Sequence, residues 1–254
     1  MTTPWRWIPP LAGGGPFQMA LDDLLLDQAI AARAPQACLR LYSWSGPWLS
    51  VGYHQRHLPA SWLALAEQGQ IGLVRRPSGG RAVLHGGSLT YALIQPNPAG
   101  DRRQAYRDHC RWLQRAFAEM DLPLSFGTAR AAADSGNCFA RASAADLVHS
   151  NGAKRIGSAQ LWRRGALLQH GSLLIDPPGD LWWQLFEEAP PELPALPVAG
   201  AELGALLRRA AAVDLGGGTL EERPLDRQEW AELRGRIASQ PQALPEGISP
   251  GRQE

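Results

Sequence analysis

Cys138 and Lys154, sixteen residues apart, are the strongest candidates for covalent chemistry in this sequence of 254 residues. Cys138 lies in an irregular Ser-Gly-Asn-Cys stretch, and irregular segments on a rigid scaffold are where reactive groups are usually placed. A loop cysteine can also be inert, and a nearby cation that lowers the pKa of its thiol is what makes it a nucleophile. Lys154 can supply that cation.

Lys154 is also the only lysine of the chain, because the other 24 of the 25 basic residues are arginines. Arginine and lysine are exchangeable where a charge only keeps a surface soluble. A guanidinium cannot replace an ammonium that must titrate or fit a narrow pocket. Alternatively, a codon bias could have left this one lysine by chance, without a function. The residues around Lys154 favour a functional role.

The segment RRPSGGRAVLH, from Arg75 to His85, combines arginines with a glycine pair. Gly79 and Gly80 leave backbone N–H groups unhindered, so that a carbonyl or phosphate oxygen can approach them. A glycine pair can also form nothing more than a tight turn. The adjacent arginines favour a site for an anion or for an acyl carrier.

Two later segments, KRIGSAQ from Lys154 to Gln160 and QHGSLL from Gln169 to Leu174, follow in strand-like surroundings. His170 in the second segment is another candidate neighbour for Cys138. Most histidines in strands are simply packed, and a catalytic role is the alternative.

The composition limits the remaining possibilities. With 44% apolar and 19% charged side chains the chain can form a sizeable core, and its formal net charge of +1 provides no overall field for nucleic acid or anionic lipid. We therefore expect no nucleic-acid and no membrane partner.

No apolar run approaches the ~20 residues that span a bilayer, and the first ten residues lack a signal-peptide pattern, so we predict a cytoplasmic protein. Cys38, Cys110 and Cys138 form no CxxC pair, which argues against disulfides and against a metal site.

The first half of the chain predicts a helix and then a sheet. Residues 16–34 have helical apolar spacing after a proline. Residues 38–44, 47–55 and 71–78 are interpreted as strands of one sheet, with a helix over 60–68. Residues 81–94 predict a hairpin with a turn at Gly86-Gly87.

The second half predicts a helix over 102–120 and then strands between 144 and 176. These strands meet at an Asn151-Gly152 turn and at a second turn near Arg164-Gly165. A short helix is expected over 179–187. Eight of the last 66 residues are prolines, and one further helix is expected near 227–238. We predict an α+β fold with a mixed or antiparallel sheet packed by helices, a catalytic domain over 1–188 and a proline-rich extension over 189–254.

Taken in series, the three motifs resemble the successive signatures of the biotin/lipoate protein ligase family. The resemblance covers residues 16–188 and implies that family's catalytic domain. The chain is similar to the cysteine-dependent octanoyltransferase branch of the lipoate-protein ligase A-like proteins. Two features favour this branch. Lipoate ligases typically have a third glycine at the position of Arg81, and they have no cysteine at the position of Cys138.

The resemblance implies transfer of an octanoyl group from octanoyl-acyl carrier protein to a lysine of a lipoyl-domain protein, such as the glycine cleavage H protein, in lipoate biosynthesis. Cys138 would form a thioester, and Lys154 would favour its thiolate and bind the acyl carbonyl. No cofactor is expected, and the protein is expected to be a monomer. The predicted substrate-binding residues are Arg75, Arg76, Ser78, Gly79, Gly80, Val83, His85, Gly157, Ser158, Ala159, His170 and Gly171.

Three alternatives stay open at this point. The first is an ATP-dependent lipoate-protein ligase, in which the glycine segment and Lys154 hold an acyl-adenylate and ATP and Mg²⁺ are required. The second is an amidotransferase that moves octanoyl between lipoyl domains by the same cysteine. The third is a non-catalytic homologue that binds acyl carriers.

Overall fold

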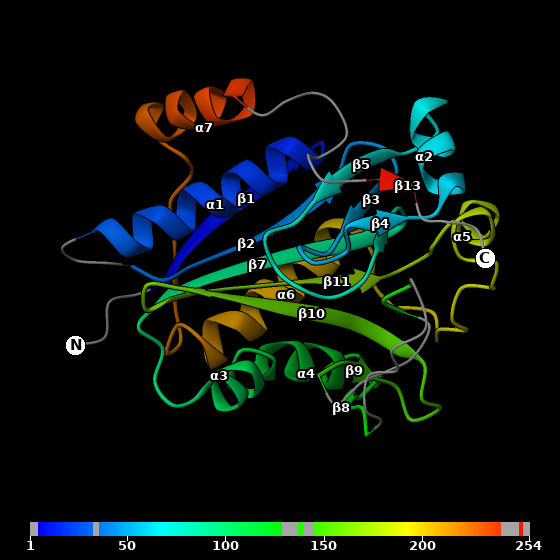
Figure 1. The fold of residues 1–254 in the computed structure, drawn as a ribbon. Helices are drawn as coiled ribbons and strands as arrows, with labels where there is room; N and C mark the ends of the chain where they lie inside the picture. Colours follow the sequence, from blue (N-terminus) through cyan, green and yellow to red (C-terminus); the bar gives the residue numbers. More distant parts are fainter. Residues whose placement is uncertain (1–4, 33–35, 129–136, 140–144, 240–248, 251–254) are drawn as a thin grey trace.

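An eight-stranded sheet runs through the centre of the computed structural model, which describes residues 5–32, 36–128, 137–139, 145–239 and 249–250 (Figure 1). β1 is parallel to both of its neighbours, whereas every pair from β2 to β8 is antiparallel. The predicted α+β fold with a mixed sheet is therefore confirmed. Across the sheet the order is β12 (Leu220–Glu222), β1 (Trp5–Gly13), β2 (Cys38–Trp44), β7 (Ser88–Pro96), β11 (Ala166–Leu174), β10 (Lys154–Arg163), β9 (Leu147–Val148) and β8 (Ser125–Phe126).

The two predicted turns bring the later motifs side by side. β9 pairs with β10 across Asn151-Gly152, and β10 pairs with β11 across Arg164-Gly165. Arg164 and Gly165 have φ angles of 48° and 82°, as a type I′ turn requires at both central positions. The resulting register places Ala159 opposite His170.

Helices cover both faces of this sheet (Figure 1). On one face lies α1 (Gly15–Ala31), with α7 (Arg227–Ser239) packed against it. The opposite face is covered by α3 (Arg102–Asp108), α4 (Arg111–Ala118) and α6 (Gly200–Asp214). Gln18 and Asp22 of α1 are fully buried although they are polar, because both side chains point to the large sheet and bond to Arg40 of β2.

A separate three-stranded sheet lies beside the large one and has the order β5 (Gly72–Arg75), β3 (Trp48–Val51), β6 (Val83–His85). It shares a third hydrophobic core with α2 (Ala60–Glu67) and α5 (Gly179–Phe186), in which Trp62 and Trp182 are buried. A short two-stranded pair joins β4 (His57–Leu58) and β13 (Ser249–Pro250). The small sheet positions the segment that follows Arg75.

Two predictions of strand pairing are wrong. The strands expected in one sheet are divided, because β2 belongs to the large sheet and β3 and β5 to the small one. The hairpin expected over 81–94 does not form, because β6 pairs with β3 while β7 pairs with β2 and β11. Gly87 explains the error: its φ is 64° and a Cβ there would lie 1.7 Å from the Asp176 carbonyl oxygen. The glycine pair lets the chain pass close to another backbone between the two sheets.

Two helix predictions also need correction. The helix expected over 102–120 is interrupted at His109 and Cys110, between α3 and α4. In its described residues the C-terminal extension contains the helices α6 and α7 and the strands β12 and β13, not one short helix. Leu203 and Leu207 of α6 are buried in the core beneath the large sheet, so the missed helix is part of the main fold. The domain boundary at residue 188 stays a prediction.

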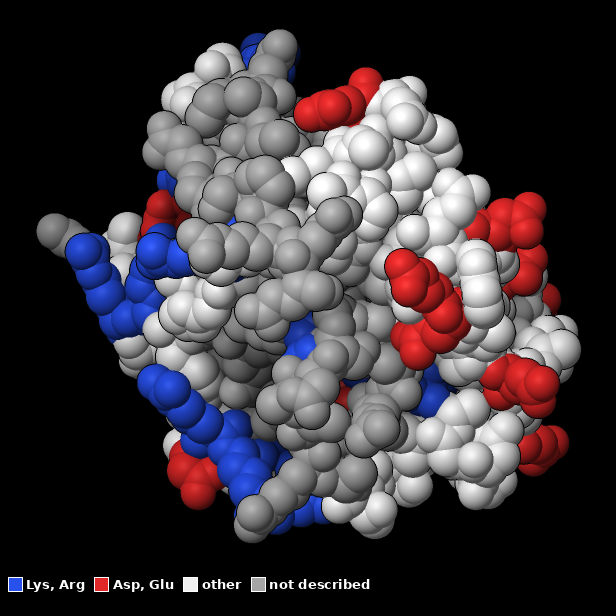
Figure 2. Space-filling view, turned by 45° about the vertical axis from the view of Figure 1, so that its right-hand side comes forward, with Lys and Arg blue, Asp and Glu red and all other residues white. Residues whose placement is uncertain are grey.

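The surface charges are separated locally although the net charge is only +1. In Figure 2 most acidic side chains of the visible face lie on the right and most basic side chains on the left. Among the described residues, no helix combines the length and the apolar character that crossing a membrane requires.

Candidate active site

The segment from Arg76 to Arg81, called the glycine loop below, connects β5 to β6 and is held from within by the Arg76 side chain. The Arg76 guanidinium donates to the carbonyl oxygens of Gly79 at 3.0 Å, Arg81 at 2.5 Å and Ser50 at 2.8 Å. Gly80 has a φ of 92°, in the region that glycine tolerates best. Arg76 is therefore a structural centre of the loop as well as a residue of the site.

Cys138 lies next to this loop. Its backbone N–H donates to the carbonyl of Ala82 at 2.9 Å, and Asn137 forms a parallel bridge with the same residue. The Asn137 side chain accepts from the N–H of Phe139 and donates to Glu188 at 2.5 Å. These bonds fix the short stretch that carries the thiol.

Lys154 reaches Cys138 from the start of β10. Its Nζ lies 3.6 Å from Sγ of Cys138 and 2.6 Å from the Cys138 carbonyl oxygen. Nζ also makes a 2.8 Å ion pair with Asp146 and lies 4.7 Å from the centre of the Phe139 ring. Lys154 is only 3% exposed, and this burial strengthens its interaction with any negative charge on the sulfur. The predicted pairing of Cys138 with Lys154 is present in the structure.

Arg76 is a second cation near the thiol. Burial lowers the pKa of Arg76, and a negative charge on Cys138 opposes this lowering. Two cations, Lys154 and Arg76, therefore lie near the sulfur.

Cys38 and Cys110 differ from Cys138. Burial raises the pKa of each thiol to about 12, so neither is a nucleophile near neutral pH. Cys110 lies in the core beneath the large sheet. Cys138 is the partly exposed cysteine of the three.

A narrow cavity of about 60 Å³ extends from Cys138 between the two sheets. Its walls come from both sheets and from α1, with Met19, Tyr42 and Trp44 among the apolar residues. Nine of the twelve predicted substrate-binding residues line this cavity: Arg76, Gly80, Val83, His85, Gly157, Ser158, Ala159, His170 and Gly171. The structure brings the three sequence motifs together around one space.

Three predicted substrate-binding residues do not line this cavity. Arg75 donates to the carbonyl oxygens of Gly52, Tyr53 and Gln55 and so braces a neighbouring turn. Successive residues of a strand point to opposite faces, which separates Arg75 from Arg76. Ser78 and Gly79 line a more open hollow on the other side of the glycine loop.

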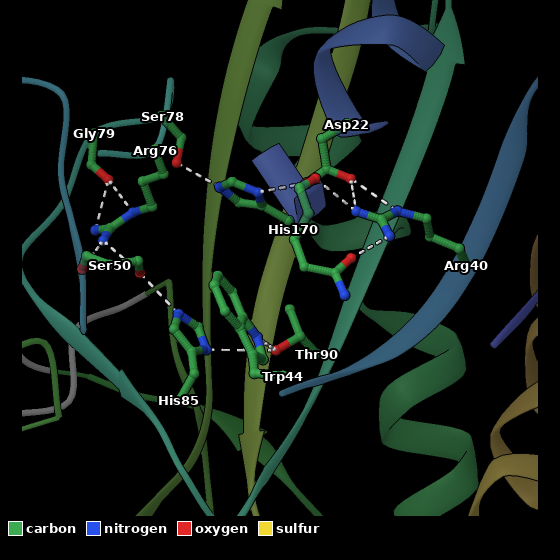
Figure 3. A network of polar contacts seen from close by, with 11 residues as sticks. Asp22, Arg40, Trp44, Ser50, Arg76, Ser78, Gly79, His85, Thr90 and His170 are labelled. Carbon is green, nitrogen blue, oxygen red and sulfur yellow. Dashed lines mark hydrogen bonds and ion pairs between the residues drawn. The ribbon is translucent and has the colours of Figure 1, made fainter. Parts of the chain in front are cut away.

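A chain of charged and polar side chains reaches the glycine loop from α1 and the large sheet (Figure 3). We call it the carboxylate chain: Arg40, Asp22, His170 and Ser78. Arg40 pairs with Asp22 at 2.6 Å, Asp22 Oδ2 lies 3.3 Å from Nδ1 of His170, and Nε2 of His170 lies 2.5 Å from Oγ of Ser78. The charge of Arg40 and the hydrogen bond to His170 hold the pKa of Asp22 below its usual value in spite of burial.

A second chain reaches the same loop from the other end of the cavity (Figure 3). We call it the hydroxyl chain: Trp44, Thr90, His85, Ser50 and Arg76. The Trp44 indole donates to Thr90 at 2.9 Å, His85 Nε2 lies 2.7 Å from Ser50 Oγ, and the His85 ring stacks on Trp44 with centroids 4.0 Å apart. Burial and the nearby Arg76 and His170 keep the pKa of His85 well below its usual value.

Sequence reasoning did not find Asp22 and Asp146. An aspartate in an amphipathic helix is normally assigned to its solvent face, and only its contacts with Arg40 of β2 and His170 of β11 show that Asp22 faces the large sheet. Asp146 precedes β9, and the predicted Asn151-Gly152 turn, which folds this strand back onto β10, was a signal that it lies near Lys154.

Comparison with known proteins agrees with this geometry. The model of the lipoyl protein ligase A/B catalytic domain matches residues 15–193, most of the chain. The chain belongs to this family.

Curated relatives of this family member are octanoyltransferases. It is 34% identical to octanoyltransferase LipM of Halalkalibacterium halodurans over an alignment of 194 residues that covers 72% of this chain and 70% of that protein. It is also 34% identical to octanoyltransferase LipM of Bacillus subtilis, over 72% of this chain and 69% of that one. The predicted family, its octanoyltransferase branch and the assignment as an acyltransferase enzyme are confirmed.

Solved structures show the same fold at low sequence identity. Protein Ta0514 of T. acidophilum with bound lipoic acid has a TM-score of 0.75 and 18% identity, covering 93% of this chain and 95% of that one. Lipoate-protein ligase A bound with ATP has a TM-score of 0.74 and 18% identity over the same shares.

Proposed function

We propose that this family member moves an octanoyl group from acyl carrier protein to a lysine of a lipoyl-domain protein through a thioester on Cys138. The observation that carries the proposal is the position of the Cys138 sulfur, 3.6 Å from the buried ammonium of Lys154, beside a narrow cavity. The octanoyltransferase relatives support the reaction class. The geometry supports the cysteine as its intermediate carrier.

In the first step the Cys138 thiolate attacks the carbonyl carbon of the donor thioester. A new C–S bond forms to Cys138, the old one breaks, and the carrier thiolate leaves and takes up the proton that Cys138 gave up. One thioester replaces another, so the step is nearly neutral in free energy. Lys154 and Arg76 stabilise the attacking thiolate, and Lys154 also lies close enough to bind the carbonyl oxygen as it becomes negative.

In the second step the amine of the acceptor lysine attacks the thioester on Cys138 and forms an amide. An amide is more stable than a thioester, so this transfer proceeds without ATP. We therefore propose that neither ATP nor Mg²⁺ takes part. Lys154 is already bound to Asp146, which keeps its ammonium in position for both steps.

The cavity supplies the proposed site for the eight-carbon chain. Val83 and Ala159 give it apolar walls from the small and the large sheet, and Gly80 and Gly157 leave space near the sulfur. The proposed partners are octanoyl-acyl carrier protein and a lipoyl-domain acceptor. A monomeric state and a cytoplasmic location stay predictions.

Intact-protein mass spectrometry after mixing with octanoyl-acyl carrier protein, without ATP, tests the proposal. Wild type and Cys38→Ser should gain one octanoyl group that hydroxylamine removes, and Cys138→Ser should not. Cys38 is a matched control because it borders an open hollow, where a serine hydroxyl can reach water. No adduct on wild type, with acceptor modification only after adding lipoate, ATP and Mg²⁺, would instead establish a ligase.

A further inference from the structure

We propose that Arg155 is a positioning residue for Lys154. It is the extra residue of a β-bulge that turns the Lys154 side chain to the face of the large sheet where Cys138 lies. The inference rests on the proposed function of Lys154 at Cys138 and names what directs this side chain to the sulfur. It concerns a fully buried cation that is not among the residues lining the cavity and that the two proposed steps do not use.

The alternation of side chains along a strand shows why a bulge is needed. Successive residues of a strand point to opposite faces, so a regular β10 would place Lys154 on the face of Ile156 and opposite to Gly157. Ile156 belongs to the core on the side of α4 and α6. Lys154 lies on the other side, because a Cβ on Gly157 would come within 3.0 Å of Lys154 Nζ. One extra residue between Lys154 and Gly157 removes this conflict.

The register of β9 and β10 identifies that residue. Lys154 pairs with Val148, whereas the next residue of β9, Leu147, pairs with Ile156. Arg155 is therefore the additional residue of β10, and this count of two residues against one defines a β-bulge. Bulges occur next to active sites, where they redirect a side chain. Here the redirected side chain is that of Lys154.

The Arg155 side chain points away from the cavity. Its guanidinium carbon lies 5.9 Å from the centre of the Phe117 ring of α4, and Phe117 belongs to the same core as Ile156. In the view of Figure 1, α4 lies below β10. Arg155 and Ile156 thus share one face of the sheet, and Lys154 and Gly157 share the other.

Three acceptors from separate segments hold the buried guanidinium. Arg155 Nε donates to Nε2 of His149 at 2.9 Å. Its two terminal nitrogens donate to the carbonyl oxygen of Leu174, at 2.8 Å, and to that of Pro194. His149 precedes the turn into β10, Leu174 ends β11, and Pro194 belongs to the C-terminal extension. These bonds fix the bulged residue from three parts of the chain.

Packing alone does not explain an arginine at this position. Among the described residues none of the Arg155 hydrogen bonds goes to a carboxylate, and burial lowers its pKa to about 10, which leaves it charged near neutral pH. Burying a charge without an anion costs stability. Burial and the Arg155 charge lower the pKa of His149 to about 4, so the imidazole is neutral and offers a lone pair. The bonds of the guanidinium therefore serve to hold the bulge.

The test follows the reactivity of the Cys138 sulfur, which can be measured without the octanoyl reaction. Labelling with iodoacetamide is followed by peptide mass from pH 5 to pH 9 for wild type and Arg155→Met, and for Lys154→Ala with and without Arg155→Met. Arg6→Met is the matched control. Arg6 is also buried and also donates to two backbone carbonyl oxygens, but it borders a hollow that Cys138 does not line.

We expect Arg155→Met to be labelled about tenfold more slowly at pH 7, the effect of one pKa unit at a thiol, and to need a higher pH for half-maximal labelling. The groups near the sulfur are the cations of Lys154 and Arg76, and Asp146 is the carboxylate paired with Lys154. In the Lys154→Ala background, Arg155→Met should change nothing further, because the cation that it positions is absent. Arg6→Met should follow wild type at every pH.

A second pair of variants keeps the test informative if Arg155→Met does not fold. His149→Leu removes one acceptor of the guanidinium and should slow labelling in the same direction by a smaller factor. His149→Gln keeps an oxygen that can accept from Arg155 and should restore most of the wild-type rate.

Two results would overturn the inference. One is labelling and octanoyl loading of Arg155→Met at the wild-type rates. The other is an equal slowing with Lys154 present and with Lys154→Ala, which would mean that Arg155 only stabilises the fold. If wild type gains no octanoyl group while the expected labelling pattern is found, the proposed thioester is wrong but the positioning of Lys154 by Arg155 is supported.

Discussion

The carboxylate chain and the hydroxyl chain each contain one histidine, but the two histidines contact different groups. His170 in the carboxylate chain contacts Asp22, whereas His85 in the hydroxyl chain contacts Ser50 and lies near Thr90. Both histidines are buried and both line the cavity. A carboxylate can compensate an imidazolium and a hydroxyl cannot, so the two buried histidines have different electrostatic surroundings.

Replacing the carboxylate should have the largest effect on stability. Asp22→Asn leaves the Arg40 guanidinium, 1% exposed, without its anion, and removing one partner of a buried pair costs about 3–5 kcal/mol. Thr90→Val is the matched change in the hydroxyl chain and should cost about 1–2 kcal/mol for the lost hydrogen bonds. Urea unfolding at pH 7.5 measures both. Equal losses would contradict the distinction between the chains.

At the Cys138 end of the cavity we predict that Lys154→Arg loses most of its acyl-loading activity although the positive charge is kept. Nζ of Lys154 lies between Asp146, Cys138 and the backbone at Gly157, which leaves no space for a guanidinium. The loading rate of Cys138 should fall about 100-fold, as when one oxyanion donor is lost. The half-exposed Arg208, which pairs with Glu222 far from the cavity, provides the control, and Arg208→Lys should load normally. Near-normal loading by Lys154→Arg would show that charge alone suffices.

Acid should destabilise the protein through its neutral histidines, with the smallest effect of the three. The pKa of His85 is well below 6.5, so below pH 6.5 the unfolded chain binds a proton that the folded state does not. Stability then falls as the pH falls, by about 1 kcal/mol for this histidine between pH 7.5 and 5.5. Urea unfolding of His85→Gln should show a pH dependence weaker by this amount, and exposed His54→Gln should not. If the free energy of unfolding depended on pH in His85→Gln as it does in wild type, protonation of His85 would not be the cause of this part of the acid destabilisation.

The local pattern of the sequence was sufficient for most elements and for the motif residues of the site. Helical spacing identified α1, α2, α5 and α7, and turn residues identified the β9–β10 and β10–β11 connections. These features are decided within a few residues of the chain. The motif around Lys154 and that around His170 lie on paired strands, which explains why both line the same cavity.

What could not be predicted depends on contacts between distant segments. Gly86-Gly87 has the composition of a hairpin turn. Only the close approach of Gly87 to the backbone of Asp176 shows that the glycine is needed for packing against a distant segment. β1 contains Pro9 and Pro10, which disfavour a strand, and a register shift between Ile8 and Leu11 accommodates them. Asp22 is hidden for the same reason, because its partners Arg40 and His170 lie on strands 18 and 148 residues further along the sequence.

The most direct test of the central claim is a pulse–chase of the acyl group. Wild-type enzyme is loaded from octanoyl-acyl carrier protein, separated from the donor, and mixed with an apo-lipoyl domain without ATP, and both proteins are followed by intact mass. We expect the octanoyl mass to leave the enzyme and to appear on the lipoyl domain in equal amount and at one rate. An adduct that stays on the enzyme, or an acceptor that becomes octanoylated while the adduct persists, would contradict transfer through Cys138.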